Sequence, residues 1–286
     1  MEWLNEYQKH VEEAIEKFLS EQYPEQPWAM DQKTFREALL FAIRSGTKTR
    51  IHPILAMIVY EELLWITAEA GLFAFIGLEF IYTGFSLHLE MVDASRPRPL
   101  LLKHDMISTY GEPMTLLVGD ALSNLGIDCL SKAGKMTIIR EIMNTINSKG
   151  MVEWIIQDLL VDYAHFGEKE YISIHDEMES RLLSSSLVIG ALFAGDAPDV
   201  MVDQLRRLWL FLGRAHQIGI DIALYEENTQ KWISHEPNQY GVVDFLWIDQ
   251  SKQLFEKLGV ELINITTNFR SSKFEDIVHL FLERKI

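Results

Sequence analysis

Apolar residues recur at three- and four-residue spacing along most of the chain. This pattern predicts amphipathic helices over residues 3–19, 35–44, 53–66, 114–130, 151–166 and 200–224. Prolines and glycines mark the breaks between these helices and predict short loops there. The breaks are at 23–28, 96–99, 134, 150, 195–198 and 235–241. No stretch alternates in the way a half-buried strand would. We therefore expect about ten or more helices covering roughly two-thirds of the chain.

The helical pattern runs through the chain without a long linker, a repeat or a low-complexity run. Such continuity predicts a single all-α domain over residues 1–286. The pattern continues after Gly241, and residues 241–286 are expected to pack as a helical tail of the same domain.

The most apolar segment, residues 71–93, has the length of a membrane span. It carries Glu79, His88, Glu90 and Asp93, which are costly in hydrocarbon. We therefore expect a buried core helix and no transmembrane segment. Residues 1–20 are charged and lack the apolar stretch of a secretion signal.

Charge and cysteine content narrow the possible partners and compartment. A net charge of -16 disfavours binding to nucleic acid or to an anionic membrane, so any anionic ligand needs a local basic cluster. The single cysteine, Cys129, excludes an internal disulfide and is typical of a reducing compartment. The sequence thus predicts a cytoplasmic protein.

One local basic cluster lies in the segment SGTKTRIHPIL, residues 45–55. Lys48, Arg50 and His52 stand at a glycine-containing break directly before an apolar helix, which suits a phosphate group. The alternative is a solvated turn with ordinary surface cations.

Two groups of acidic residues could bind a metal. Glu90 and Asp93 lie one helical turn apart, and Mg²⁺ prefers carboxylate and phosphate oxygens. The alternative is a polar stripe on a buried helix, with His88 a core histidine. Asp221 lies in an apolar helix and needs a metal or a cation as partner, such as Arg214 or a lysine.

In order and spacing these segments resemble the trans-prenyltransferase family, the polyprenyl, farnesyl and geranylgeranyl diphosphate synthases. The family's G-G-K-R-x-R-P resembles residues 47–53, its H-D-D-x-x-D resembles 88–93, and its F-G-E-A-x-x-x-x-G-D-A-L resembles 110–122. Its G-M-V and F-Q-x-x-D-D-x-x-D motifs resemble segments beginning at Gly150 and His216. The resemblance covers about residues 30–235.

The resemblance implies an all-α, isoprenoid-synthase-type helical bundle around a central cavity. Two acidic helices would hold Mg²⁺ and the diphosphate of an allylic substrate, with isopentenyl diphosphate on the basic loop. Carried over residue by residue, it assigns the metal ligands, the diphosphate-binding residues and the cavity residues. These are Glu90, Asp93 and Asp221 for the metal, Lys48, Arg50, His52, Arg98 and Lys103 for diphosphate, and Gly84, Phe85, His88 and Gln217 for the cavity.

The sequence departs from the family at the catalytic positions. Leu89, Ile220 and Leu224 replace carboxylates, so three of the usual six remain. Thr49 stands at the family's lysine position, and Lys48 directly precedes it. His52 stands at the position of the last arginine. We therefore expect Mg²⁺ binding to be weakened or absent, and no catalytic residue is assigned.

Three functions stay open, and the sequence does not decide whether the protein is an enzyme. The first is a non-catalytic or modulatory subunit, a homodimer or a heterodimer with a full-motif prenyl diphosphate synthase, as the family's dimers imply. The second is an atypical Mg²⁺-dependent prenyltransferase or terpenoid-forming enzyme using allylic and isopentenyl diphosphates, with Glu226 aiding the retained acids. The third is an isoprenoid-binding or structural helical protein without metal.

Overall fold

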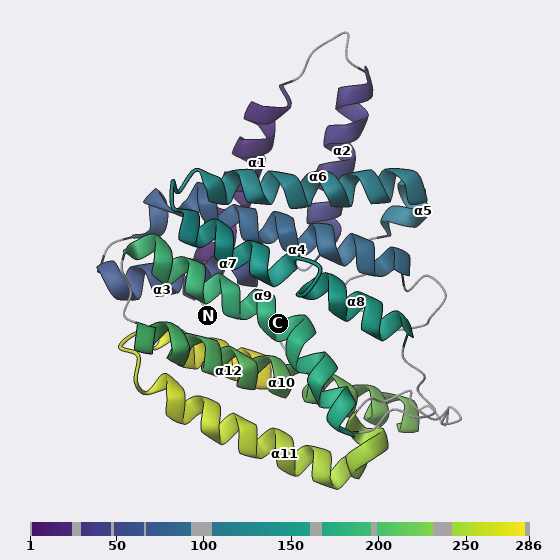
Figure 1. Ribbon diagram of the computed structural model, residues 1–286, viewed down its shortest axis with the longest axis vertical. Helices are drawn as coiled ribbons and strands as arrows, with labels where there is room; N and C mark the ends of the chain where they lie inside the picture. The colour runs from purple at the N-terminus through teal and green to yellow at the C-terminus, as the bar shows by residue number, and fades with distance from the viewer. Residues whose placement is uncertain are drawn as a thin grey trace. The chain divides into compact units, whose positions relative to one another are not determined.

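The computed structural model describes residues 2–24, 30–46, 49–65, 67–92, 105–160, 168–195, 199–230 and 242–283. These residues form α-helices joined by short turns, with one 3₁₀ helix and no strand among them (Figure 1). The predicted all-α class is confirmed. The chain divides into two compact units, residues 1–142 with 189–195, and residues 143–188 with 196–286.

The first unit contains the helices that carry the basic segment and the first acidic segment. They are α1 (Glu2–Gln22), α2 (Met30–Ser45), α3 (Ile51–Leu64), η1 (Ala68–Ala70), α4 (Leu72–Val92), α5 (Met106–Tyr110), α6 (Glu112–Ser131) and most of α7 (Met136–Ile146). The amphipathic α1 shows why they pack together. Its apolar face, including Leu4, Val11, Ile15 and Phe18, is buried while the intervening charged residues face solvent.

Helix α4 is the centre of the first unit. It packs against α1, α2, α3 and α6, and most residues from Ala74 to Leu87 are buried. Among the described helices, α4 is the one long and apolar enough to cross a membrane, and 72% of its most apolar window is buried within the protein. Burial of this kind is typical of a core helix, which agrees with the expectation for residues 71–93.

Glycines bring α4 and α6 into backbone contact at two levels. Gly77 lies against Gly126, and Gly84 lies against Gly119 and Ser123, so the two helices run antiparallel. The glycines in each helix are seven residues apart, which places both on one face. A Cβ at Gly77 would lie only 2.5 Å from the Gly126 carbonyl oxygen, and that backbone atom cannot turn aside.

The second unit contains the helices of the second acidic segment. They are α8 (Met151–Leu160), most of α9 (Glu168–Ala194), α10 (Asp199–Gln230), α11 (Val242–Thr266) and α12 (Lys273–Leu282). Helices α10, α11 and α12 contact one another, and the buried Trp209 ring of α10 meets Phe281 of α12 at 5.7 Å. Helix α11 is interrupted at Trp247, whose φ of 61° and ψ of 156° are not helical.

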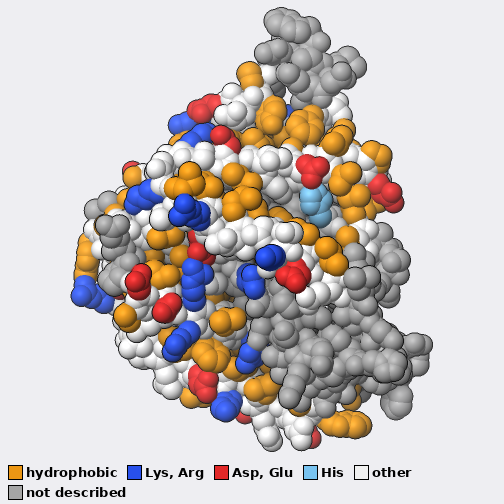
Figure 2. All heavy atoms as spheres, in the orientation of Figure 1, with side chains coloured by type: hydrophobic (Ala, Val, Ile, Leu, Met, Phe, Trp, Pro, Cys, Tyr) orange, Lys and Arg blue, Asp and Glu red, His pale blue; other side chains and the backbone are white. Residues whose placement is uncertain are grey.

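Charged and apolar side chains are mixed on the surface of the described residues. On the face shown in Figure 2, acidic and basic side chains lie among apolar ones. Large apolar side chains that are well exposed include Trp65 after α3, Leu116 and Leu117 on α6, and Met136 at the start of α7.

Substitution of Gly77 by alanine is expected to lower the free energy of unfolding by about 1–3 kcal/mol, because the new methyl group forces α4 away from α6. The midpoint of urea unfolding, followed by circular dichroism, measures the change. Gly259→Ala is the matched control, since its Cβ would meet only the Leu282 side chain at 3.2 Å. Equal midpoints for the two variants would show that the α4–α6 contact tolerates the extra atom.

Candidate diphosphate and metal site

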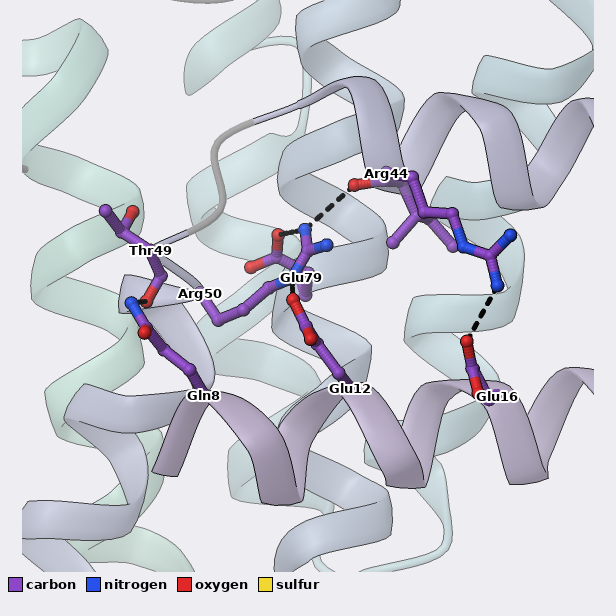
Figure 3. A network of polar contacts seen from close by, with 8 residues as sticks. Gln8, Glu12, Glu16, Arg44, Thr49, Arg50 and Glu79 are labelled. Carbon is purple, nitrogen blue, oxygen red and sulfur yellow. Dashed lines mark hydrogen bonds and ion pairs between the residues drawn. The ribbon is translucent and has the colours of Figure 1, made fainter. Parts of the chain in front are cut away.

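Arg50 of the basic segment points into the first unit and not into solvent. It precedes α3 in the left-handed conformation, with φ 50° and ψ 37°, and its side chain is 3% exposed. Its Nη1 donates hydrogen bonds to the Ile43 carbonyl oxygen at 2.9 Å and to Oε1 of Glu79 on α4 at 2.8 Å (Figure 3). Oε1 of Glu12 on α1 lies 3.7 Å from Nε. The guanidinium charge is therefore compensated inside the protein.

Glu79 is the partner that the sequence did not assign to this site. Its side chain is 1% exposed. Burial raises the pKa of Glu79, and the adjacent Arg50 guanidinium opposes that rise. The sequence does contain a signal for this role: Glu79 lies within the apolar segment 71–93, and a buried carboxylate needs a partner. What the sequence could not supply was which cation, 29 positions away, would reach it.

Two residues that flank the connection between α2 and α3 contact α1. The side-chain amide of Gln8 donates to the Thr49 carbonyl oxygen at 3.3 Å, and Arg44 at the end of α2 pairs with Glu16 at 2.7 Å (Figure 3). These contacts join Thr49 and the end of α2 to α1. Lys48, predicted to bind diphosphate, lies outside the described residues.

His52 lies in the first turn of α3 and is buried. Its ring contacts the Tyr82 ring of α4, with centroids 4.4 Å apart. Burial lowers the pKa of His52 to about 3, so the imidazole is neutral at physiological pH. A neutral ring contributes no positive charge to a diphosphate.

The first acidic segment ends α4. Glu90 and Leu89 are half-buried in the last turns of the helix, and Leu89 offers no ligand atom beside the carboxylate. Burial raises the pKa of Glu90, and the nearby Asp105 carboxylate adds to the rise. Asp93, Arg98 and Lys103 lie outside the described residues.

The predicted cavity residues of α4 face neighbouring elements. Phe85 is buried, and Gly84 lies in the close contact with α6. The ring of His88 lies over the backbone of Gly119 on α6, where a Cβ would come within 2.5 Å of Nε2. The Asp120 carboxylate is 3.4 Å from the same nitrogen. The Gly119–Asp120 pair, which belongs to the 110–122 motif, thus lies against the His88 ring, two residues before Glu90.

The second acidic segment lies in α10 of the second unit. Asp221 is 4% exposed and accepts hydrogen bonds from the Gln217 side-chain amide at 2.9 Å and from the Val242 backbone N–H at 2.8 Å. Glu226 pairs with Lys252 of α11 at 2.7 Å. Two hydrogen-bond donors thus contact the Asp221 carboxylate.

The fit of Mg²⁺ depends on how many oxygen ligands converge. Among the described residues, no three histidine, cysteine, aspartate or glutamate side chains converge on a possible metal position. Glu90 has no second carboxylate from position 89, and both oxygens of Asp221 already accept hydrogen bonds. Among the described residues, Glu90 and Asp221 therefore do not by themselves make up a Mg²⁺ site, and Asp93, the third predicted ligand, lies outside them.

Removal of the Glu79 carboxylate is expected to be strongly destabilising. Glu79→Ala leaves the buried Arg50 charge without its main partner, which lowers the unfolding free energy by about 3–5 kcal/mol. The control Arg44→Ala breaks an exposed ion pair and costs about 1 kcal/mol or less. Urea unfolding compares the two, and the double variant Arg50→Met, Glu79→Leu should recover most of the loss. Equal losses for Glu79→Ala and Arg44→Ala would contradict the internal role of the pair.

His52 should make the fold sensitive to acid. Its pKa is lower in the folded than in the unfolded chain, so the unfolded chain binds more protons below about pH 6.5. The unfolding free energy then falls as pH falls from about 6.5 towards 3, by up to ~1.4 kcal/mol per pH unit. Unfolding measured across this range should show a shallower slope for His52→Phe. His279→Asn, on the exposed side of α12, is the control, and an unchanged slope in His52→Phe would refute the assignment.

The sequence matches no protein-family model and no curated protein. The structure is similar to that of a geranyltransferase from Legionella pneumophila, with a TM-score of 0.79, 20% identity, and 99% of this chain and 96% of that chain covered.

Two further structures share the fold. For an FPP/GFPP synthase from Zymomonas mobilis the TM-score is 0.75 at 19% identity, covering 97% of this chain and 98% of that one. For a geranyltranstransferase from Methanosarcina mazei the TM-score is 0.73 at 20% identity, covering 96% of this chain and 94% of that one. The resemblance to trans-prenyltransferases is thus confirmed for the fold: this chain has the all-α fold of farnesyl and geranyl diphosphate synthases over nearly its whole length.

Proposed function

We propose that this protein is a prenyl diphosphate synthase-like subunit of isoprenoid biosynthesis that does not elongate prenyl chains by itself. It modulates a full-motif synthase in the cytoplasm as a member of a hetero-oligomer. The observation that carries this proposal is the internal use of the basic segment. Arg50 is buried and paired with Glu79, and His52 is buried and neutral.

The physical reason is the charge that the reaction requires. Ionisation of an allylic diphosphate leaves a highly anionic product, which must be stabilised by metal ions and cations as it forms. Position 89 offers an alkyl group, as do positions 220 and 224. Arg50 cannot reach a ligand without leaving a carboxylate unpaired in the core, which is costly. Each change lowers affinity for diphosphate, and together they favour a regulatory role.

Exposed apolar side chains support the association with another subunit. Leu116 and Leu117 of α6 are 45% and 58% exposed, and Met136 at the start of α7 is 65% exposed. Adjacent exposed leucines of this kind suit the apolar centre of a helical interface, in which methionine is also enriched. We place the subunit contact on this part of α6.

An atypical Mg²⁺-dependent prenyltransferase is the second candidate, and Glu90 is the observation that favours it. Its Oε2 is buried and makes no hydrogen bond to any described residue. An unsatisfied buried carboxylate oxygen is what a site prepared for a cation would contain. In this case Glu90 and Asp93, with Asp221, bind fewer metal ions than the family's full set.

Calorimetry with farnesyl diphosphate, with and without MgCl₂, followed by addition of isopentenyl diphosphate, separates the two candidates. The subunit proposal predicts no longer product from the protein alone. Co-expression with the full-motif synthase of the same genome should give a complex that co-elutes and a changed ratio of product lengths. Leu117→Glu should weaken the complex, whereas Val260→Glu, on the exposed side of α11, should not.

Chain elongation by the purified protein, lost on Glu90→Gln, would reject the subunit proposal and establish the enzyme. Neither elongation nor co-elution would reject both candidates and favour a binding or structural role.

A further inference from the structure

Asp221 joins two helices of the second unit. Its carboxylate projects from α10, and one oxygen accepts the N–H of Val242, the first residue of α11. The other oxygen accepts the Gln217 amide from one turn earlier in α10. The side chain is almost completely buried, so these donors replace the water that would otherwise solvate it.

The first turn of α11 has particular need of such a partner. The first four N–H groups of any helix lack intrahelical acceptors, and a carboxylate near them is also favoured by the helix dipole. In α11 the break at Trp247 separates the first turn, Val242–Leu246, from the continuous helix that follows. This turn therefore receives little support from the rest of α11.

Helices α10 and α11 pack against each other, and beyond the break they also share an ion pair. Lys252, beyond the break, pairs with Glu226, and both side chains are more than 40% exposed. An exposed pair of this kind contributes little to stability. The buried hydrogen bond from Val242 is consequently the stronger of these two polar contacts.

We propose that Asp221 is a positioning residue that fixes the first turn of α11 on α10, and that it is not a metal ligand. A divalent cation bound to this carboxylate would displace the Val242 N–H or place its charge beside the positive end of the helix. Capping and metal binding therefore compete for the same oxygens. The inference goes beyond the proposed function, and under the second candidate it leaves Glu90 and Asp93 to bind metal without Asp221.

Hydrogen exchange of the full-length protein, read by mass spectrometry in peptides covering residues 242–246, tests the proposal. Asp221→Ala should speed exchange in this turn about five-fold, the size expected for loss of a helix cap. Asp221→Asn should remain close to wild type, because asparagine caps equally well and Gln217 can turn its amide to accept the new donor. Glu226→Gln, which breaks the pair with Lys252, is the matched control and should leave residues 242–246 unchanged.

The same peptides are then followed during a titration of the wild type with MgCl₂ alone. The proposal expects no change in exchange and no calorimetric binding that depends on Asp221. Binding of Mg²⁺ to the wild type that is lost in Asp221→Asn, together with altered exchange at 242–246, would overturn it in favour of a metal ligand. Unchanged exchange in Asp221→Ala would also overturn it, and if that variant does not fold, Asp221→Asn and the titration still decide.

Discussion

The first unit depends on a buried ion pair between Arg50 and Glu79. Removal of two charges from water costs several kcal/mol for each charge. The attraction between them offsets that cost only where the geometry is good and further hydrogen bonds are made. Here the guanidinium also donates to the Ile43 carbonyl oxygen and lies near Glu12. One side chain thereby connects α1, the end of α2, the start of α3 and the middle of α4 (Figure 3).

The close packing of α4 against α6 extends this constraint towards the acidic end of α4. Gly77 and Gly84 allow backbone contact at two levels, and the His88 ring then lies directly over Gly119. Helix α4 has little freedom to rotate or slide between these contacts, because well-packed interiors do not deform gradually. The position of Glu90 is thus set by the core of the unit.

The sequence predicted the helices well because periodicity is a local property. The apolar face of α1 and the burial of α4 both follow from residue spacing and from the cost of placing Glu79 or Glu90 in lipid. The order of the motifs along the chain indicated the resemblance to trans-prenyltransferases and, through it, the fold. Partners distant in sequence were harder to predict. The requirement for a partner at Asp221 was clear, but the donor is a backbone N–H 21 residues later, and no residue type marks a backbone group.

The basic segment shows a second limit of sequence reasoning. Lys48, Arg50 and His52 form a cationic cluster in the sequence, yet Arg50 turns inward to Glu79 and burial makes His52 neutral. Their charge depends on environment, and the environment is created by α4, which begins some twenty residues later along the chain. Residue type alone therefore overstates the positive charge available to a ligand.

These two sites change what the retention of a motif residue means. Arg50 and Asp221 keep the residue types of the family pattern, and in this structure both are used by the fold itself. A protein that no longer needed the chemistry would still lose stability on losing either residue. Positions 89, 220 and 224 carry alkyl side chains where the family pattern has carboxylates. Retention of Arg50 or Asp221 is therefore weak evidence for catalysis, whereas the retention of Glu90, whose Oε2 makes no hydrogen bond to any described residue, is not explained in this way.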